Sequence, residues 1–359
     1  HLLITGSFKD YHDMYHWSNG LAQVDCTVPG LEKLLAEITE GCSTDREKIG
    51  NTYAWVQQHI RYIAFEAGIQ GHKPDTPAEV LRKRYGDCKG MALLLRTLLK
   101  AQGFDARLTD IGTADIPYPM SQVPTLAAVN HMICTLFHQG NTYYLDATNE
   151  HIPPEFVPGS IQDREAVIED GEACILQPLP VLDSSASTDS LHYTCTLSGK
   201  QTEWALHGKA TRYWSGDMKE LFLTAYHEND KDGRQEFLPH ILAGDTPDYR
   251  TDSIGWITQA PGQTWAILSG TLLNKSAVQS ADTELYIAPD PHCDLFCQPI
   301  DTTKRIHDYE LPFCCRIVRH TEVEIPAGYA LAHCPEGISL HTPQGTLDCS
   351  FQQAGNKVI

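Results

Sequence analysis

The apolar residues of this chain recur with two different periods. From Ser7 to about Gly103 they return every three or four positions, which is the period of amphipathic helices. After Gly103 they occur in short alternating runs, which are typical of strands. Helices followed by an antiparallel sheet predict an α+β domain in the first part of the chain.

Capping signals mark where the predicted helices begin. Thr44 with Glu47, and Thr76 with Glu79, both fit the capping box, and Pro77 suits the first position of a helix. A first helix is predicted to begin at Ser7. The next two have apolar faces made by Leu31, Leu34, Leu35 and Ile38, and by Ile49, Tyr53, Val56 and Ile60.

The predicted strands of this domain follow Gly103. They are Ala106 to Ile111, Val129 to Phe137 and Thr142 to Leu145. Gly140 and Asn141 indicate a turn between the last two strands. The proline-broken stretch from Pro117 to Pro124 is interpreted as a connector.

The second half of the chain reads as mainly β. A stretch rich in Pro, Asp and Ser around Leu179 to Ser190 is interpreted as a linker, and Met218 to Tyr226 as a helix among short strands. We therefore predict a core domain over 1–182 and a mainly-β, sandwich-type region over 183–359, made of one module or of two that divide near 300. Residues 1–6 resemble the tail of a strand, so we expect a β-domain upstream of them.

Composition narrows the function classes. No apolar run approaches the roughly 18 residues of a membrane-spanning helix, so the chain is not expected to be an integral membrane protein. Its 46 acidic residues against 27 basic ones give a formal charge of −19, which would repel a phosphate backbone. We therefore do not expect the chain to bind nucleic acid. The 12 cysteines are compatible with free thiols or with disulfides and leave the compartment open.

One cysteine lies where a nucleophile would be activated. A helix is predicted to begin near Cys88 and to end at Gly103, with Asp87 as its N-cap. The sulfur would then face the positive end of the helix dipole, which stabilises a thiolate. Gly86 and Gly90 are expected to leave the approach to the sulfur open.

His131 and Asp146 are the residues expected to complete a catalytic triad with Cys88. His131 begins one strand and would act as the general base, while Asp146 ends the next strand and would orient the imidazole. To lie directly opposite each other, they require a hairpin centred between His138 and Gln139, whereas the turn signal lies slightly later. If the register slips, Asn149 is the alternative orienting residue.

These motifs resemble the transglutaminase-like superfamily of papain-fold enzymes. The likeness rests on Gly-Asp-Cys-Lys at a helix start, Asn-His at a strand start and Leu-Asp-Ala-Thr after it. More closely, the chain resembles a bacterial branch in which such a core lies between two β-rich domains. Further parts that match are Trp55-Val56, Ile60 to Tyr62, Thr76 to Leu81, Ile325 to Tyr329 and Cys334-Pro335. Gly90 and Ala147 stand where that branch commonly has other residues.

The resemblance implies a thiol enzyme that hydrolyses peptide or amide bonds, or transfers the acyl group to an amine, through a thioester on Cys88. It implies Tyr62 as a second oxyanion donor beside the backbone N–H of Cys88, a peptide or protein substrate, no cofactor, and export beyond the cytoplasmic membrane. Some members of this superfamily do not turn over. The alternative is therefore a catalytically silent envelope module that binds peptide or glycan.

Metal sites are not expected. His292, Cys293 and Cys297, with Cys314 and Cys315 beyond them, lack the paired spacing of a structural zinc site. His12 and His16 share a helical face, but no third ligand accompanies them. An exposed polar face explains the two histidines better.

Overall fold

The computed structural model describes residues 8–64, 67–200, 203–244, 248–257, 264–290, 303–306 and 311–359. The strand tail and the upstream domain expected from residues 1–6 lie outside this description, and so do His292, Cys293 and Cys297. The first helix begins at Tyr11 and not at Ser7. Asp10 sets this boundary, because its side chain accepts the backbone N–H of Asp13 at 3.0 Å.

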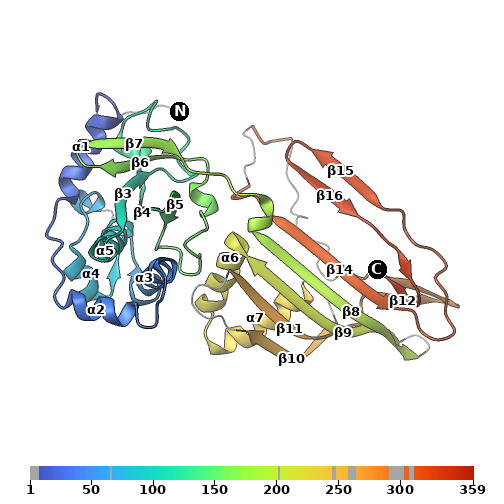
Figure 1. Cartoon of the computed structure of the whole chain (residues 1–359). Coiled ribbons are helices and arrows are strands. Elements are labelled where there is room, and N and C mark those ends of the chain that lie inside the picture. The colour runs from blue at the N-terminus through green and yellow to red at the C-terminus, as the bar shows by residue number, and fades with distance from the viewer. Residues whose placement is uncertain are drawn as a thin grey trace.

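The chain forms two regions that lie side by side (Figure 1). In its described residues, the first contains five α-helices around a five-stranded sheet. Its helices are α1 (Tyr11–Ala22), α2 (Leu31–Ile38), α3 (Asp45–His59), α4 (Pro77–Lys83) and α5 (Cys88–Ala101). Its antiparallel sheet has the order β5 (Asn141–Leu145), β4 (His131–His138), β3 (Asp105–Ile111), β6 (Glu165–Asp170) and β7 (Ala173–Pro178). A short parallel pair joins β1 (Arg61–Tyr62) to β2 (Tyr85–Gly86).

The predicted helix caps are present. Thr44 and Glu47 form the complete capping box, whereas Thr76 accepts from the N–H of Glu79 but the Glu79 carboxylate pairs with Arg82. Helix α5 ends before Gly103, whose φ of +88° few other residues adopt. Between these limits, α5 buries Leu94, Leu95, Leu98 and Leu99 against α3, β3 and β4. This apolar contact fixes the direction in which the first turn of α5 points.

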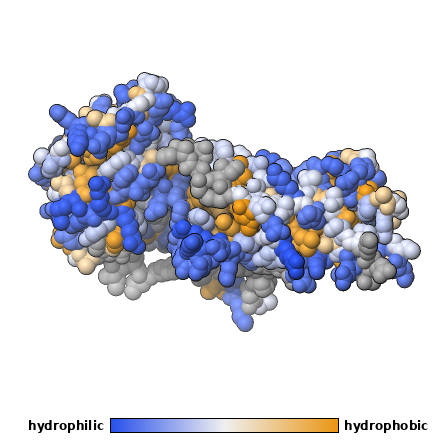
Figure 2. Space-filling model, turned by 90° about the horizontal axis from the view of Figure 1, so that it is seen from below, coloured by the Kyte–Doolittle hydropathy of each residue, from blue (hydrophilic) through white to orange (hydrophobic). Residues whose placement is uncertain are grey.

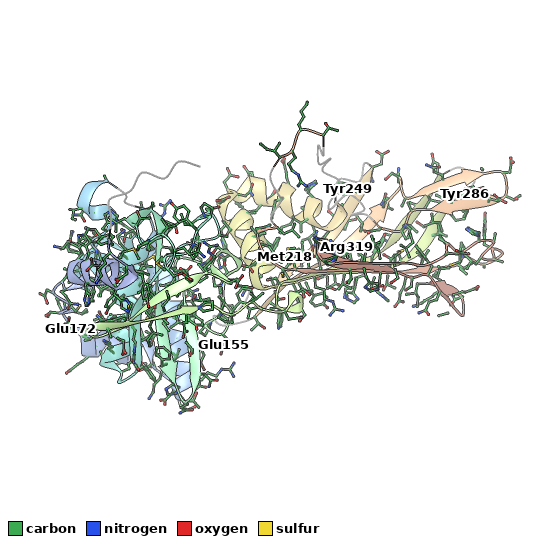
Figure 3. The ribbon with its side chains drawn as sticks, turned by 90° about the horizontal axis from the view of Figure 1, so that it is seen from above. Glu155, Glu172, Met218, Tyr249, Tyr286 and Arg319 are labelled. Carbon is green, nitrogen blue, oxygen red and sulfur yellow. The ribbon has the colours of Figure 1, made fainter. Side chains whose placement is uncertain are left out.

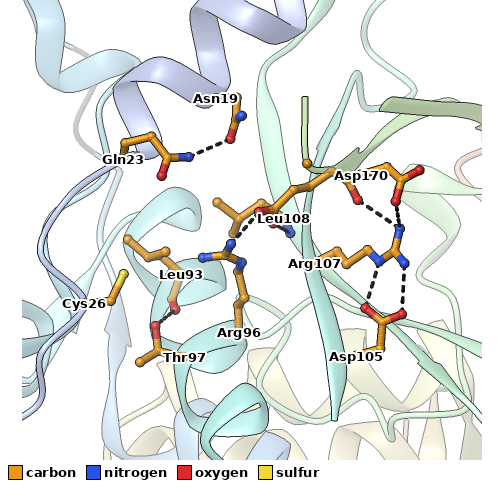
Figure 4. Close-up of polar contacts among 12 residues, drawn as sticks. Asn19, Gln23, Cys26, Leu93, Arg96, Thr97, Asp105, Arg107, Leu108 and Asp170 are labelled. Carbon is orange, nitrogen blue, oxygen red and sulfur yellow. Dashed lines mark hydrogen bonds and ion pairs between the residues drawn. The ribbon is translucent and has the colours of Figure 1, made fainter. Parts of the chain in front are cut away.

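Polar contacts attach the other face of α5 to the sheet (Figure 4). Arg96 of α5 binds the carboxylate of Glu169 at the end of β6. Glu169 also accepts the backbone N–H of Leu108 in β3 at 3.0 Å, beyond the last β3–β6 pair. Arg107 bridges Asp105 and Asp170 at the same end of the sheet. The helix and two strands are thus held in a fixed relation.

The second region is mainly β. Its large sheet has the order β10 (Tyr249–Ile257), β11 (Trp265–Asn274), β9 (Glu203–Ser215), β8 (Thr188–Lys200), β14 (Arg316–Glu324), β18 (Lys357–Val358) and β17 (Gln353–Ala354). Two small hairpins are β12 (Val278–Ala281) with β13 (Glu284–Ile287), and β15 (Ile338–Thr342) with β16 (Gly345–Cys349).

In the part of this region that the structure describes, two helices cover the large sheet where the predicted sandwich would have a second sheet. They are α6 (Gly216–Glu228) and α7 (Lys231–Ala243), which lie on one of its faces (Figure 3). Phe222 of α6 and Leu242 of α7 pack onto strand residues such as Leu268. Sequence analysis missed α7 because Pro239 interrupts its helical pattern.

Strand β14 pairs in parallel with β8, so strands from both sides of residue 300 share one sheet. A buried ion cluster supports this pairing. Asp189 of β8 binds Arg212 of β9 at 2.6 Å and Arg319 of β14 at 3.1 Å. The first sheet ends at Pro178 and β8 begins at Thr188, and the predicted boundary at 182/183 falls between them.

The surface seen from below carries hydrophilic residues over most of its area, with hydrophobic residues in separate patches (Figure 2). Among the residues that the structure describes, no helix is long and apolar enough to cross a membrane.

The packing of α5 makes a stability prediction. We expect Leu98→Ala to lower the free energy of unfolding by about 2–5 kcal/mol, because Leu98 is fully buried and its loss leaves a cavity. Lys100→Ala, two positions along the same helix at an exposed site, should change it by less than about 0.5 kcal/mol. Urea unfolding followed by circular dichroism measures both variants. If both variants lost the same free energy of unfolding, the packing of Leu98 would not anchor the core.

Candidate active site

The start of α5, the start of β4 and part of α1 enclose a small pocket of about 70 Å³. Both Cys88 and His131 line it. The remaining lining residues are Met14, Trp17, Ser18, Gly71, His72, Lys89, Asp110, Leu126, Val129, Asn130 and Met132.

Cys88 is the first residue of α5 and is 8% exposed. Asp87 caps this helix by accepting the backbone N–H of Gly90 at 2.9 Å, and its other oxygen binds Lys89 at 2.5 Å. The backbone N–H of Cys88 lies in the first turn, where a helix has no acceptor of its own for such donors. The pocket therefore meets the electropositive end of α5 at the sulfur.

Gly86 and Gly90 serve a different purpose from the expected one. A Cβ on Gly90 would lie 3.0 Å from Cγ2 of Val80, and one on Gly86 would lie 3.3 Å from its Cγ1. The two glycines thus let α4 approach the start of α5 closely. The expectation that Gly86 and Gly90 open the approach to the sulfur was wrong, because their missing side chains make room for Val80. Sequence patterns alone could not show this packing.

His131 and Asp146 are in direct contact. Nε2 of His131 lies 2.8 Å from Oδ2 of Asp146. The same carboxylate accepts the side-chain amide of Asn149 at 2.8 Å and the hydroxyl and backbone N–H of Thr148 at 2.7 and 3.2 Å. Because Nε2 is engaged, Nδ1 is the ring nitrogen left for the sulfur of Cys88.

The hairpin explains how Asp146 reaches His131. Its pairs run from His138 with Asn141 to Cys134 with Leu145, so its centre lies between Gln139 and Gly140, one position later than direct opposition requires. Asp146 directly follows the end of β5, and in this register it lies level with Ile133, two positions from His131. A shift of two positions keeps a side chain on the same face, whereas a shift of one would not. Asn149 supports Asp146 instead of replacing it.

The electrostatics favour a charged imidazole. Burial alone would lower the pKa of His131, but the charge and hydrogen bond of Asp146, together with the sulfur of Cys88, outweigh it and raise that pKa to about 10. Burial also works to raise the pKa of Asp146, yet His131 and Thr148 hold it below its usual value. Each charge is retained in the interior because the other is present.

The backbone of Tyr62 lies beside the segment that leads into Cys88. It pairs with Gly86 in the short β1–β2 ladder, and its side chain is 40% exposed. It is not among the residues that line the pocket. Its role as an oxyanion donor stays a prediction.

Sequence analysis missed Asp110 and the contribution of α1. Asp110 lies in β3 and is 8% exposed, and burial raises its pKa to about 6 against the opposing effects of Ser18 and Lys89. A carboxylate next to Ile111 in a strand expected to be largely buried was the available signal. Trp17 and Ser18 give no comparable signal, because α1 reaches the pocket only through the tertiary fold.

The histidines of α1 are exposed, as expected for His12 and His16. In the described part of the chain, no group of three or more His, Cys, Asp or Glu side chains could hold a metal ion.

Comparison with known proteins supports the resemblance. Residues 32–132 match the family model described as the transglutaminase-like superfamily, and residues 284–359 match a domain of unknown function, DUF3858. No curated protein matches the chain. The core is thus transglutaminase-like, and the fold as a whole is α+β, as predicted.

Two solved structures are similar. The crystal structure of a putative protease from Parabacteroides distasonis matches 98% of this chain with a TM-score of 0.55 at 13% identity, which shows a shared fold. This chain spans 51% of that protein. A putative cysteine protease from Cytophaga hutchinsonii matches 34% of this chain and 38% of its own at 20% identity, with a TM-score of 0.27, too low to support an argument.

The ion pair makes a pH prediction. Since the folded pKa of His131 lies above its ordinary value of 6.5, the stabilisation is complete below about pH 6.5 and is lost as the pH rises through about 10. In Asp146→Asn the opposing charge is absent, so burial should take the pKa of His131 below its ordinary value. NMR titration of the imidazole measures both proteins. An unchanged pKa in the variant would contradict the assignment of Asp146.

Asp110 makes a second pH prediction. Its raised pKa means that the folded state binds a proton more tightly than the unfolded state, so its contribution to stability falls as the pH rises from about 4 to about 6. Asp110→Asn should therefore raise the free energy of unfolding near neutral pH by on the order of 1–3 kcal/mol, with a smaller gain near pH 4. Urea unfolding at both pH values tests this, and a loss of stability near neutral pH would refute it.

Proposed function

We propose, from the premise that residues 32–132 form a transglutaminase-like core, that this chain is a thiol hydrolase of peptide or amide bonds. The observation that carries the proposal is the His131–Asp146 contact at 2.8 Å, together with the position of His131 in the same pocket as Cys88 at a helix start. Transfer of the acyl group to an amine is the close variant. A peptide or protein is the proposed substrate.

The geometry suggests the following sequence of steps. The thiolate of Cys88 attacks the substrate carbonyl carbon, and the negative charge passes to the carbonyl oxygen. As the carbon–nitrogen bond breaks, the His131 imidazolium gives its proton to the leaving amine, and a thioester remains on Cys88. His131 then accepts a proton from water, whose oxygen attacks the thioester. The carbon–sulfur bond breaks, releasing the acid and restoring the thiolate and imidazolium.

Two further features belong to this proposal. The backbone N–H of Cys88 would stabilise the oxyanion, with Tyr62 as the candidate second donor. The resemblance to exported proteins supports a location beyond the cytoplasmic membrane.

Selective alkylation tests the nucleophile. Iodoacetamide should modify Cys88 at least ~10-fold faster than exposed Cys314 and Cys349 near neutral pH, although Cys88 is far less accessible. Accessibility alone predicts the opposite order, so only an activated sulfur gives this result. Cys88→Ala should abolish the fast modification and leave that of Cys314 and Cys349 unchanged. Peptide mapping by mass spectrometry measures each site.

A second measurement separates catalysis from the silent binding module. Incubation with a peptide library should give an acyl adduct on Cys88 that mass spectrometry detects. Ligand binding that survives Cys88→Ala, with no adduct in the unaltered protein, would favour the binding module over the hydrolase.

A further inference from the structure

The loop that carries Asp146 lies at the joint between the two regions. It runs from Asp146 to Ile152, and the carboxylate that orients His131 stands at its first residue. A short hydrogen bond to an imidazole requires the carboxylate to stay within a few tenths of an ångström. The contacts that fix this loop therefore bear on the orientation of His131.

The first region holds the loop from one side through α3. The hydroxyl of Tyr53 donates to the backbone carbonyl of Asp146 at 2.8 Å. The side-chain amide of Gln57 donates to the carbonyls of Asn149 and Ile152 at 2.6 and 2.9 Å. All of these contacts satisfy acceptors of the loop, and none satisfies its backbone N–H groups.

The second region supplies the missing acceptor. Glu220 of α6 receives the backbone N–H of Glu150 on Oε1 at 3.1 Å and that of His151 on Oε2 at 2.9 Å. The end of α6 that bears Met218, two residues before Glu220, lies next to the first region (Figure 3). When one carboxylate accepts two consecutive backbone N–H groups, it fixes the orientation of the two peptide units that carry them.

We propose that Glu220 is a positioning residue, through which the second region fixes the Asp146 loop and aims His131 at Cys88. The proposal rests on the function proposed above in so far as Cys88 and His131 are its reacting pair. It gives the mainly-β region a defined part in the chemistry. None of the residues that line the pocket at Cys88 belongs to that region, but its helix α6 contacts the loop on which the carboxylate stands.

Burial supports a specific purpose for this carboxylate. Burial raises the pKa of Glu220 to about 7, although the two loop N–H groups and Lys219 oppose that rise. Stability alone would favour an apolar side chain at such a position. The two backbone donors explain why a carboxylate is present.

Asp217 offers a matched control on the same helix. It also accepts a backbone N–H of the first region, that of Gly159 on Oδ1 at 3.0 Å, and its other oxygen binds the hydroxyl of Ser187 at 3.1 Å. Asp217 thus attaches α6 to the first region without touching residues 146 to 152. We expect loss of either carboxylate to weaken the joint, and only loss of Glu220 to remove contacts to the loop.

The test compares Glu220→Ala with Asp217→Ala in the full chain. Glu220→Ala should lower the pKa of His131, read by NMR, and slow the alkylation of Cys88 by ~10-fold, the size of effect that a small displacement of a reacting group produces. Asp217→Ala should change the alkylation rate less than ~2-fold, whatever its effect on thermal stability. Glu220→Gln keeps one oxygen acceptor and should fall between Glu220→Ala and the unaltered chain.

The outcomes are separable. Equal effects of the two alanine variants, or a His131 pKa that Glu220→Ala and Glu220→Gln both leave unchanged, would overturn the positioning role. Failure of Cys88 to react selectively in the unaltered chain would instead overturn the proposed function, and the imidazole titration would still decide the role of Glu220. If Glu220→Ala does not fold, the milder Glu220→Gln provides both readouts.

Discussion

The site depends on one buried ion pair, that of His131 with Asp146. Removing either charge from water is costly, and the pair persists only while hydrogen bonds hold both groups in place. The carboxylate of Asp146 accepts hydrogen bonds from the side chains of His131, Asn149 and Thr148. The sheet carries the imidazole, the joint between regions carries the carboxylate, and the helix start carries the sulfur. The helix start and the sheet therefore meet at the pocket, and the joint between regions supplies the carboxylate behind the imidazole.

The features that were predictable from sequence are local ones. Asp87 and Cys88 are adjacent in the chain, so a capping signal was sufficient to place the sulfur at a helix start. The face of Asp146 was also predictable, because the two-residue period of a strand fixes it. The position of the turn was less certain. Gln139 and Gly140 both adopt positive φ angles of 50° and 79°, and nothing in the identity of Gln139 indicates that conformation.

The features that were not predictable depend on contacts between distant segments. Glu220 lies about seventy positions after the loop that it holds, and no periodicity links the two. The covering of the large sheet by α6 and α7 follows from apolar residues on two helices, one of which contains Pro239. Asp110 shows the intermediate case, since its charge within a predicted strand was visible in the sequence while its neighbours Ser18 and Lys89 were not.

The parallel pairing of β14 with β8 has a consequence for biosynthesis. A ribosome releases Cys88, His131 and Asp146 well before it makes β14, which lies between β8 and β18 and contributes Arg319 to the ion cluster around Asp189. A nascent or prematurely terminated polypeptide would thus contain Cys88, His131 and Asp146 without the strand that pairs with β8. Until β14 is made, one edge of β8 lacks the backbone partners that this strand supplies, so the sheet stays incomplete along that edge.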